Sequence, residues 1–262
     1  MKKTLLVLFA MVLCAVMAAQ PKVVGHRGCR YAGPFENTLA SLKVAQAAGV
    51  DAVEFDVHLT ADDEVIVFHG PQVPGVGKDI RAMTFAEARK VVLPGGHRMP
   101  TLQEWFRQGK KHPEITLIME IKAQLSDEKL DRLVDTAMQQ VEQYKGKIKV
   151  EYTSFSTRAC DRILAKDAGA KVIYLDSGVG VPDAAWAKAR GYTGISYNLD
   201  AFLNRPEVAA QAREMGIETT LWLVNDYEVA DWAVRHGIDY ISSDFPEKLV
   251  PYIDAVKAYR QQ

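Results

Sequence analysis

The chain has 262 residues, of which 48% are hydrophobic and 25% are charged, a composition typical of globular proteins and not of disordered or fibrous ones. A formal net charge of -1 gives no reason to expect a nucleic acid or an anionic membrane surface as a partner. The length suits one or two domains, and a single α/β barrel of about 250 residues is a common solution. Nothing in the sequence indicates the oligomeric state.

Residues 1–19 have the pattern of a secretory signal peptide. Two lysines near the start precede an apolar run over residues 5–16, and small residues follow at Ala18 and Ala19. The run is too short and wrongly flanked for a membrane-spanning helix. A lipoprotein signal built on Cys14 is disfavoured, because a bulky leucine precedes the cysteine. We therefore expect cleavage near Ala18 or Ala19 and an exported protein, periplasmic or secreted, without stable membrane insertion.

The rest of the chain, residues 20–262, is expected to form one domain in which strands and helices alternate. The strand-like runs are residues 22–26, 51–59, 115–121, 148–155, 171–175, 192–197, 218–224 and 239–243. The helix-like stretches are residues 36–49, 101–111, 126–144, 156–169, 183–191, 205–216, 226–237 and 246–260. Glycines that suit helix C-termini stand at Gly49, Gly169, Gly191, Gly216 and Gly237.

This alternation predicts an α/β fold, a closed (β/α)₈ TIM barrel with a short insertion after the second strand. An open doubly wound sheet is the main alternative, but no Gly-rich dinucleotide-binding loop follows the first strand. The segment from Gly70 to Pro100, rich in Gly and Pro, is the insertion. We expect it to overhang the C-terminal mouth of the barrel.

Two cysteines, Cys29 and Cys160, remain after the predicted cleavage. They lie far apart in the sequence, and a domain of this size does not need a disulfide to be stable. We therefore expect two buried thiols, although export would permit a disulfide.

The second predicted strand carries Glu54, Asp56 and His58 at every second position. Successive side chains of a strand point to opposite faces, so these three share one face and the apolar residues at 53, 55, 57 and 59 share the other. A solvent-exposed polar face is the plain alternative. In a barrel, however, catalytic residues gather at the C-terminal ends of the strands, which favours an inward-facing functional site.

The same rule selects residues at the ends of other predicted strands. They are His26 and Arg27 on the first strand, His69 after the run EVIVF, Glu120 and Lys122 on the third strand, Trp222 on the seventh and Asp244 after the eighth. We interpret Asp244 as the N-cap of the last helix, and Asn225 with Asp226 as the start of the helix before it, because Asp and Asn are favoured there.

Three carboxylates that converge in a barrel cannot all be ionised unless a cation compensates them, because like charges and desolvation raise their pKa values. Carboxylate oxygens favour a hard divalent ion, Ca²⁺ or Mg²⁺, over zinc. An arginine and a lysine beside such an ion suit the oxygens of a phosphate, and two histidines suit proton transfer. The pattern therefore predicts metal-dependent phosphate chemistry.

The chain resembles the glycerophosphodiester phosphodiesterase family in the ordered motifs GHRG, ENTLAS, VEFDVHLT, VIVFH, MPTLQEW, MEIK, LWLVND and GIDYISSDFP. The resemblance covers essentially the whole mature chain. It implies a TIM barrel that uses a divalent cation to hydrolyse a small glycerophosphodiester to glycerol 3-phosphate and an alcohol. It matches His26 and His69 to acid/base residues, Glu54, Asp56 and Glu120 to metal ligands, Arg27 and Lys122 to positions near the phosphate, and Trp222 to an aromatic at the pocket edge.

The family mechanism implies that one histidine takes a proton from the attacking hydroxyl and the other protonates the leaving alcohol. Which histidine does which stays open, as does the nucleophile, either water or a hydroxyl of the substrate. We interpret Glu36 as a support for Arg27, and His58 as a packed or supporting residue. One departure is clear: the family usually has His-Asp where this chain has His69-Gly70.

Two other functions fit the pattern less well. A phospholipase that acts on intact lipid would be expected to carry an amphipathic, basic or aromatic insertion, and none is evident. A catalytically silent phosphodiester-binding barrel would not need paired histidines. The leaving alcohol depends on the shape of the pocket, which we expect the 70–100 insertion, Tyr197, Phe202 and Trp222 to determine.

Overall fold

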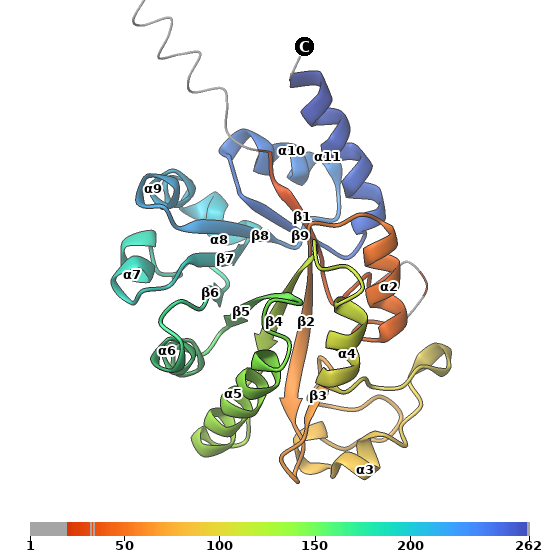
Figure 1. Cartoon of the computed structure of the whole chain (residues 1–262). Coiled ribbons are helices and arrows are strands. Elements are labelled where there is room, and N and C mark those ends of the chain that lie inside the picture. Colours follow the sequence, from red (N-terminus) through yellow and green to blue (C-terminus); the bar gives the residue numbers. More distant parts are fainter. Residues whose placement is uncertain (1–19, 32, 34, 261–262) are drawn as a thin grey trace, which may run out of the picture.

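Eight parallel strands close into a barrel with helices around it, as Figure 1 shows for the computed structural model. The structure describes residues 20–31, 33 and 35–260, and the predicted signal peptide, residues 1–19, lies outside them. The predicted (β/α)₈ barrel is confirmed.

The barrel strands are joined side by side in chain order. They are β1 (Lys22–Gly25), β2 (Ala52–Leu59), β4 (Thr116–Ile121), β5 (Lys149–Ser154), β6 (Val172–Asp176), β7 (Gly194–Asn198), β8 (Glu218–Trp222) and β9 (Tyr240–Ser243). Closure follows because β1 pairs in parallel with both β2 and β9. One further strand, β3 (Val65–Val67), pairs antiparallel with β2 and folds the chain back along it.

All eight predicted helices are present. They are α2 (Leu39–Ala47), α4 (Leu102–Gly109), α5 (Asp127–Glu142), α6 (Thr157–Lys166), α7 (Ala184–Ala189), α9 (Glu207–Met215), α10 (Tyr227–His236) and α11 (Pro246–Arg260). Gly216 and Gly237 end their helices in the left-handed conformation, as predicted. The prediction for Gly169 is wrong, because α6 ends earlier, at an extended Asp167. A short helix, α8 (Leu199–Asn204), was not predicted, because it starts directly where β7 ends.

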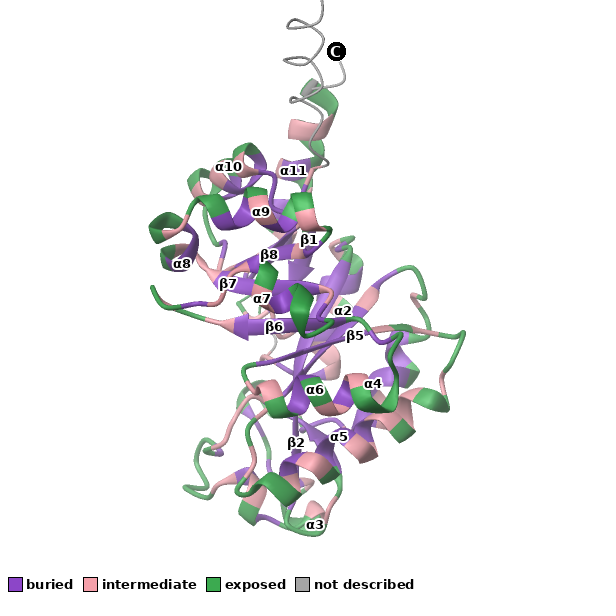
Figure 2. Ribbon diagram, turned by 90° about the vertical axis from the view of Figure 1, so that its left-hand side faces the viewer, coloured by how far each residue is buried: buried purple, intermediate pink, exposed green. Residues whose placement is uncertain are grey.

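The main core lies between the strands and the surrounding helices, and Figure 2 shows the strands as almost entirely buried. The residues of β2 at positions 53, 55, 57 and 59 are all buried in this core, as the alternation predicted. Phe55 stacks on Trp105 of α4 with ring centroids 4.9 Å apart. Cys29 and Cys160 are buried as well, and no disulfide joins them. The apolar face of β2 therefore points outward, and its polar face is turned to the barrel interior.

The 70–100 insertion lies beyond the hairpin of β2 and β3 and contains α3 (Phe85–Ala88) and two 3-10 turns, η1 (Ile80–Ala82) and η2 (Pro94–Gly96). It has a small core of its own, to which Ile66 and Phe68 contribute from the hairpin; its other members are Val73, Ile80, Met83, Ala88, Val91, Leu93 and Met99. The insertion is thus packed beside the barrel as a separate unit of apolar side chains.

The N-terminal end of the barrel is closed from inside. Val24, Ile118 and Tyr240 pack together in the interior. Beneath them, the Lys171 ammonium lies 3.3 Å from a carboxylate oxygen of Glu151 and pairs with a neighbouring glutamate. The interior is therefore accessible from the end where the strands finish at their C-termini.

The turn after β1 leaves no room for a side chain at Gly28. This residue has φ +85°, and a Cβ there would lie 2.5 Å from the hydroxyl of Ser41 and 2.8 Å from its carbonyl carbon. Gly75 has a similar φ of +74°, but no atom lies within 4 Å of a Cβ built at this residue.

We predict that Gly28→Ala lowers the free energy of unfolding by about 2 to 4 kcal/mol, because overpacking adds to the cost of a left-handed backbone. Gly75→Ala is the matched control and is expected to cost about 1 kcal/mol, since it carries the backbone cost alone. Denaturation in urea measures both. Equal losses in the two variants would contradict the packing argument.

Candidate active site

The three predicted metal ligands meet at the C-terminal end of the barrel. Asp56 of β2 and Glu120 of β4 are direct partners in the sheet, and Glu54 lies on the same face of β2. One carboxylate oxygen from each lies within 4.8 Å of the others, and all three side chains are buried. The Oε1 atom of Glu54 is buried without a hydrogen-bond partner. This all-oxygen set with an unsatisfied acceptor fits a hard divalent cation.

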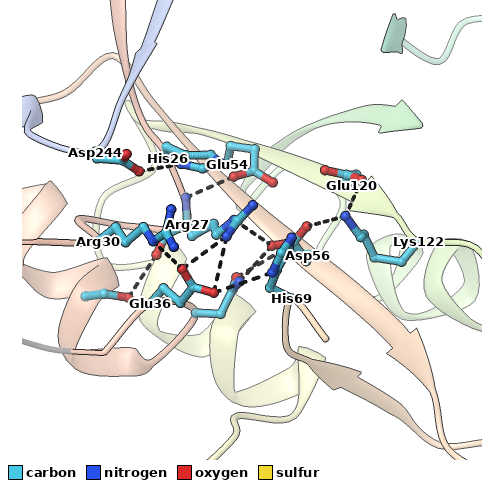
Figure 3. A network of polar contacts seen from close by, with 12 residues as sticks. His26, Arg27, Arg30, Glu36, Glu54, Asp56, His69, Glu120, Lys122 and Asp244 are labelled. Atoms are coloured by element: carbon cyan, nitrogen blue, oxygen red, sulfur yellow. Dashed lines mark hydrogen bonds and ion pairs between the residues drawn. The ribbon is translucent and has the colours of Figure 1, made fainter. Parts of the chain in front are cut away.

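Two cations flank the carboxylates, as Figure 3 shows. The Lys122 ammonium lies 2.7 Å from Oε1 of Glu120 and 3.2 Å from Oδ1 of Asp56. Nε of Arg27 lies 3.5 Å from Oδ2 of Asp56. Burial acts to raise the pKa of Asp56, but Lys122 and Arg27 outweigh it and hold that pKa well below its usual range.

The other two carboxyl groups behave in the opposite way. Burial, with the charge of Asp56 next, raises the pKa of Glu120 to about 7. Burial, then Asp56 and Glu120, raises the pKa of Glu54 well above its ordinary value. The protein therefore keeps one carboxylate charged by its own cations, whereas the other two remain poorly compensated near neutral pH.

His26 follows β1 and is held by a carboxylate. Its Nδ1 lies 2.6 Å from Oδ1 of Asp244, and Asn225 donates from Nδ2 to Oδ2 of Asp244 at 2.9 Å. Because a carboxylate only accepts, Nδ1 carries the proton and Nε2 is left as the acceptor of the neutral ring. Burial lowers the pKa of His26, although Asp244 opposes the shift.

The interpretation of Asp244 as a helix cap is therefore wrong, since both of its oxygens are used by His26 and Asn225. Asn225 likewise does not start a helix; its side-chain oxygen accepts from the Asp244 amide at 2.9 Å. Asp226 does cap α10, as predicted.

Arg27 is fixed by a strained turn. Its backbone has φ 52°, in the left-handed region that non-glycine residues rarely adopt. The Arg27 amide donates to Oε2 of Glu54 at 2.9 Å, and its guanidinium donates to Glu36 at 3.1 and 3.2 Å. Glu36 also pairs with Arg30, at 2.7 Å. Glu36 thus contacts Arg27, which is the position that the sequence analysis expected. The strained turn orients Arg27 toward the carboxylates.

His69 lies beside the same cluster. Its Nδ1 is 3.6 Å from Oε1 of Glu36. Burial lowers the pKa of His69 to about 4, against the opposing charge of Asp56. The buried ring of His58 donates from Nε2 to the His69 carbonyl at 3.0 Å, while its Nδ1 accepts from the amide of Gln124 at 3.3 Å. His58 therefore supports the backbone of His69 rather than facing the carboxylates.

Gly70, which replaces the aspartate of the usual His-Asp pair, has a backbone conformation that suits glycine. Its φ is +45°, and a Cβ there would lie 3.0 Å from the Phe68 ring and 3.2 Å from Nε2 of His58. An aspartate at this position would be strained in this backbone.

One side of a cavity of about 220 Å³ that opens at the barrel mouth is lined by His26, Arg27, Glu54, His69, Glu120 and Lys122. The other side is apolar, where Phe155 and Trp222 pack edge to face with centroids 6.3 Å apart and Leu175 lies beside them. Neither Tyr197 nor Phe202 lines the cavity, because both are fully buried in the outer core.

The predicted determinants of pocket shape are thus partly wrong. Trp222 lines the cavity, but Tyr197, Phe202 and the 70–100 insertion do not. Tyr197 follows the inward-facing Ser196 on β7 and so points outward. Phe155, which the sequence analysis did not select, stands at the end of β5 in the place that the barrel rule favours.

Asn37 was also missed. Its side chain donates to Oδ2 of Asp56 at 2.7 Å and accepts from the Asp56 amide at 3.1 Å. The motif ENT carried no signal for this pairing, because it depends on a loop that packs against β2.

The fold and the site together define a class of protein, the barrel hydrolases of phosphate esters. The fold is a TIM barrel, and the site at its C-terminal mouth combines clustered carboxylates with two histidines, an arginine and a lysine. The chain belongs more narrowly to the glycerophosphoryl diester phosphodiesterase family, whose family model matches residues 26–248. The predicted family and enzyme class are thereby confirmed.

Individual proteins show the same likeness. A glycerophosphodiester phosphodiesterase from Caldanaerobacter subterraneus is 26% identical, and the match covers 87% of this chain and 96% of that protein. A crystal structure of a glycerophosphodiester phosphodiesterase from Parabacteroides distasonis superimposes with a TM-score of 0.85 at 28% identity, covering 91% and 98% of the two chains. An Oleispira antarctica phosphodiesterase, solved in complex with the product sn-glycerol-3-phosphate, shares the fold with a TM-score of 0.81 at 22% identity, covering 90% and 97%.

Within the described part of the chain, no helix combines the length and the apolar character needed to cross a membrane.

We predict that Ca²⁺ or Mg²⁺ raises the melting temperature of the protein and that Glu54→Gln removes most of this gain, because a ligand that binds only the folded state stabilises it. In EDTA the same variant is expected to be no less stable than the wild type, since one of three mutually repelling carboxyl groups is gone. Glu151→Gln is the control: it removes another buried carboxyl of the barrel interior and is expected to keep the metal-dependent gain. A full gain in Glu54→Gln would contradict the ligand assignment.

Proposed function

We propose that the protein is a divalent-metal-dependent phosphodiesterase that hydrolyses small glycerophosphodiesters to glycerol 3-phosphate and an alcohol. The observation that carries the proposal is the buried cluster of Glu54, Asp56 and Glu120, flanked by His26 and His69 at the barrel mouth. The names of the relatives from Caldanaerobacter and Parabacteroides support the choice of substrate. We also propose that residues 1–19 direct export, which would place the activity in the periplasm or outside the cell.

Glu54, Asp56 and Glu120 would hold one divalent cation, Ca²⁺ or Mg²⁺. When bound, the ion would supply positive charge to phosphoryl oxygens and compensate the crowded carboxylates. Arg27 and Lys122 would bind the remaining non-bridging oxygens, because both already point at the carboxylate cluster and a phosphate is the natural competitor for their charge.

Both histidines line the cavity in which the diester would lie. One takes the proton of the attacking hydroxyl, either water or a hydroxyl of the glycerol, as that oxygen forms its bond to phosphorus. The other donates a proton to the alcohol oxygen as its bond to phosphorus breaks. With water as the nucleophile this step gives glycerol 3-phosphate directly, whereas attack by the glycerol hydroxyl gives a cyclic phosphate that water opens in a second step. Asp244 orients His26 and would stabilise its protonated form, as the carboxylate does in a Ser-His-Asp triad.

One set of exposed side chains favours an amphiphilic substrate as a second candidate. Leu125, Phe155, Val179 and Leu203 are exposed and follow the adjacent strands β4, β5, β6 and β7, and Phe155 also lines the cavity. One relative, 20% identical over 90% of this chain, is named lysophospholipase D. Sedimentation with phosphatidylcholine vesicles separates the candidates: strong binding favours the lipid substrate, and none favours the small diester.

We predict that the purified protein releases glycerol 3-phosphate from glycerophosphocholine or glycerophosphoethanolamine. EDTA is expected to abolish the release, and Ca²⁺ or Mg²⁺ is expected to restore it. The reason is that the crowded carboxylates need a cation before the site can bind the phosphate anion of the substrate. An enzyme-coupled assay of glycerol 3-phosphate measures the rate. Release that persists in EDTA would contradict metal dependence. No release under either ion would favour a silent phosphodiester-binding barrel.

We further predict that His26→Ala and His69→Ala each lower kcat by at least about 10²-fold, since each removes one proton-transfer group. His112→Ala is the control, because His112 is partly exposed and pairs with Glu114 away from the cavity. Circular dichroism and melting temperature check that each variant is folded. Near wild-type activity in either site variant would refute the two-histidine mechanism.

A further inference from the structure

A second hollow, of about 370 Å³, lies next to the catalytic cavity, between the loop that follows β1 and the 3-10 turn η2. Its wall includes Arg30, Tyr31, Phe35, Glu36 and Pro94. Glu36 also reaches the catalytic groups: its carboxylate lies 3.1 Å from Nη1 of Arg27 and 3.6 Å from Nδ1 of His69, and both of these residues line the catalytic cavity. The hollow therefore begins one side chain away from the groups that would bind the phosphate.

Arg30 is held firmly at the edge of this hollow. Its Nε lies 2.7 Å from Oε2 of Glu36, the same oxygen that Arg27 contacts, and Figure 3 shows the two arginines side by side at that carboxylate. The guanidinium of Arg30 also lies over the ring of Tyr31, 4.9 Å from its centroid, and Tyr31 stacks on Phe245 at 5.3 Å. A planar group held in this way loses little further freedom when it binds a ligand.

The terminal nitrogens of Arg30 are available to a ligand. Within residues 20–31, 33 and 35–260, neither Nη1 nor Nη2 has a partner, and the side chain is 32% exposed. Glu36 is the one carboxylate among the described residues that line the hollow, and it is shared with Arg27, so one negative charge serves two guanidiniums. Two parallel N–H donors of a guanidinium match the two oxygens of a carboxylate, which is therefore the group that this arrangement fits.

We propose that Arg30 and the hollow form a leaving-group subsite, which binds a carboxylate on the alcohol of the diester, as in sn-glycero-3-phosphoserine. This inference rests on the proposed function and adds a class of leaving alcohol to it. With the phosphate at Arg27, the alcohol would extend past Glu36, and its carboxylate would accept from the terminal nitrogens of Arg30. The carboxylate takes part in no bond that forms or breaks, so the subsite changes which diester is preferred and leaves the reaction unchanged.

The test compares sn-glycero-3-phosphoserine with sn-glycero-3-phosphoethanolamine. The two diesters share the glycerol, the phosphate and the ammonium group, and they differ by one carboxylate on the leaving alcohol. Both release glycerol 3-phosphate, so one enzyme-coupled assay measures both rates. Arg30→Gln removes the guanidinium and its charge. This variant is expected to lower the ratio of kcat/KM for the serine diester to kcat/KM for the ethanolamine diester by about 3- to 10-fold, the range for a partly exposed, charge-assisted contact.

Two further variants separate recognition from other effects. Arg98→Gln is the matched control: Arg98 is an exposed arginine of the insertion that donates to the carbonyl of Arg89 and lines neither the catalytic cavity nor the hollow. It removes the same charge and is expected to leave the ratio unchanged. Arg30→Lys keeps a positive charge beside Glu36 but loses the planar fork, and it is expected to lower the ratio by about 2- to 4-fold. Circular dichroism and melting temperature check that each variant is folded.

Each outcome has one meaning. A ratio that falls in both variants of Arg30 and stays constant in Arg98→Gln supports the subsite. An unchanged ratio in the variants of Arg30, with or without an equal loss on both diesters, would overturn the subsite and leave the proposed function intact, because Arg30 would then act only through Glu36 and Arg27. A wild-type protein that hydrolyses neither diester would overturn the proposed function, and the subsite with it.

Discussion

The crowding of carboxyl groups at the end of β2 and β4 is the constraint on which the site depends. Sheet register makes Asp56 and Glu120 neighbours, and alternation puts Glu54 on the same face. The chain supplies compensating charge for Asp56 from Lys122 and Arg27, but it leaves the pKa of Glu54 and Glu120 raised. A site built in this way has a deficit of positive charge, and a divalent cation with a phosphate anion is a pair that restores the balance.

The barrel interior has a charged side and an apolar side. The carboxylates, histidines and cations come from β1 to β4 or directly follow them, whereas β5, β6 and β8 contribute the apolar wall of Phe155, Leu175 and Trp222. The N-terminal end is closed by packed side chains, so a substrate enters and leaves at one end only. Low polarity on the wall opposite the charges strengthens every electrostatic contact in the cavity, which is the benefit of burying the site. The cost is local strain, seen at the left-handed Arg27.

Much of the fold and of the candidate site could be predicted from the sequence, because two local rules apply. Side chains alternate between the two faces of a strand, and the active site of a TIM barrel lies at the C-terminal ends of its strands. They place Glu54 and Asp56 inward, and Glu120 and Lys122 at a strand end, without knowledge of any contact. They fail where a residue's role depends on what packs against it. Asp244 has the sequence context of a helix cap, and only the closure of β9 against β1 brings it to His26. Tyr197 was misassigned for a different reason: strict alternation from the end of β7 would have placed it outward, beside the inward Ser196.

Gly70 stands where the family usually has an aspartate, and His69 just before it is held by other means. At φ +45° with the Phe68 ring 3.0 Å from a Cβ built there, this position would strain the aspartate that usually follows the histidine. The carbonyl of His69 is instead held by His58, whose ring is fixed in turn by Gln124 at 3.3 Å. His58 stands on β2 two residues beyond Asp56, so the strand that provides two of the carboxylates also anchors the histidine beside them. The backbone of His69 is therefore held by a residue of a buried barrel strand.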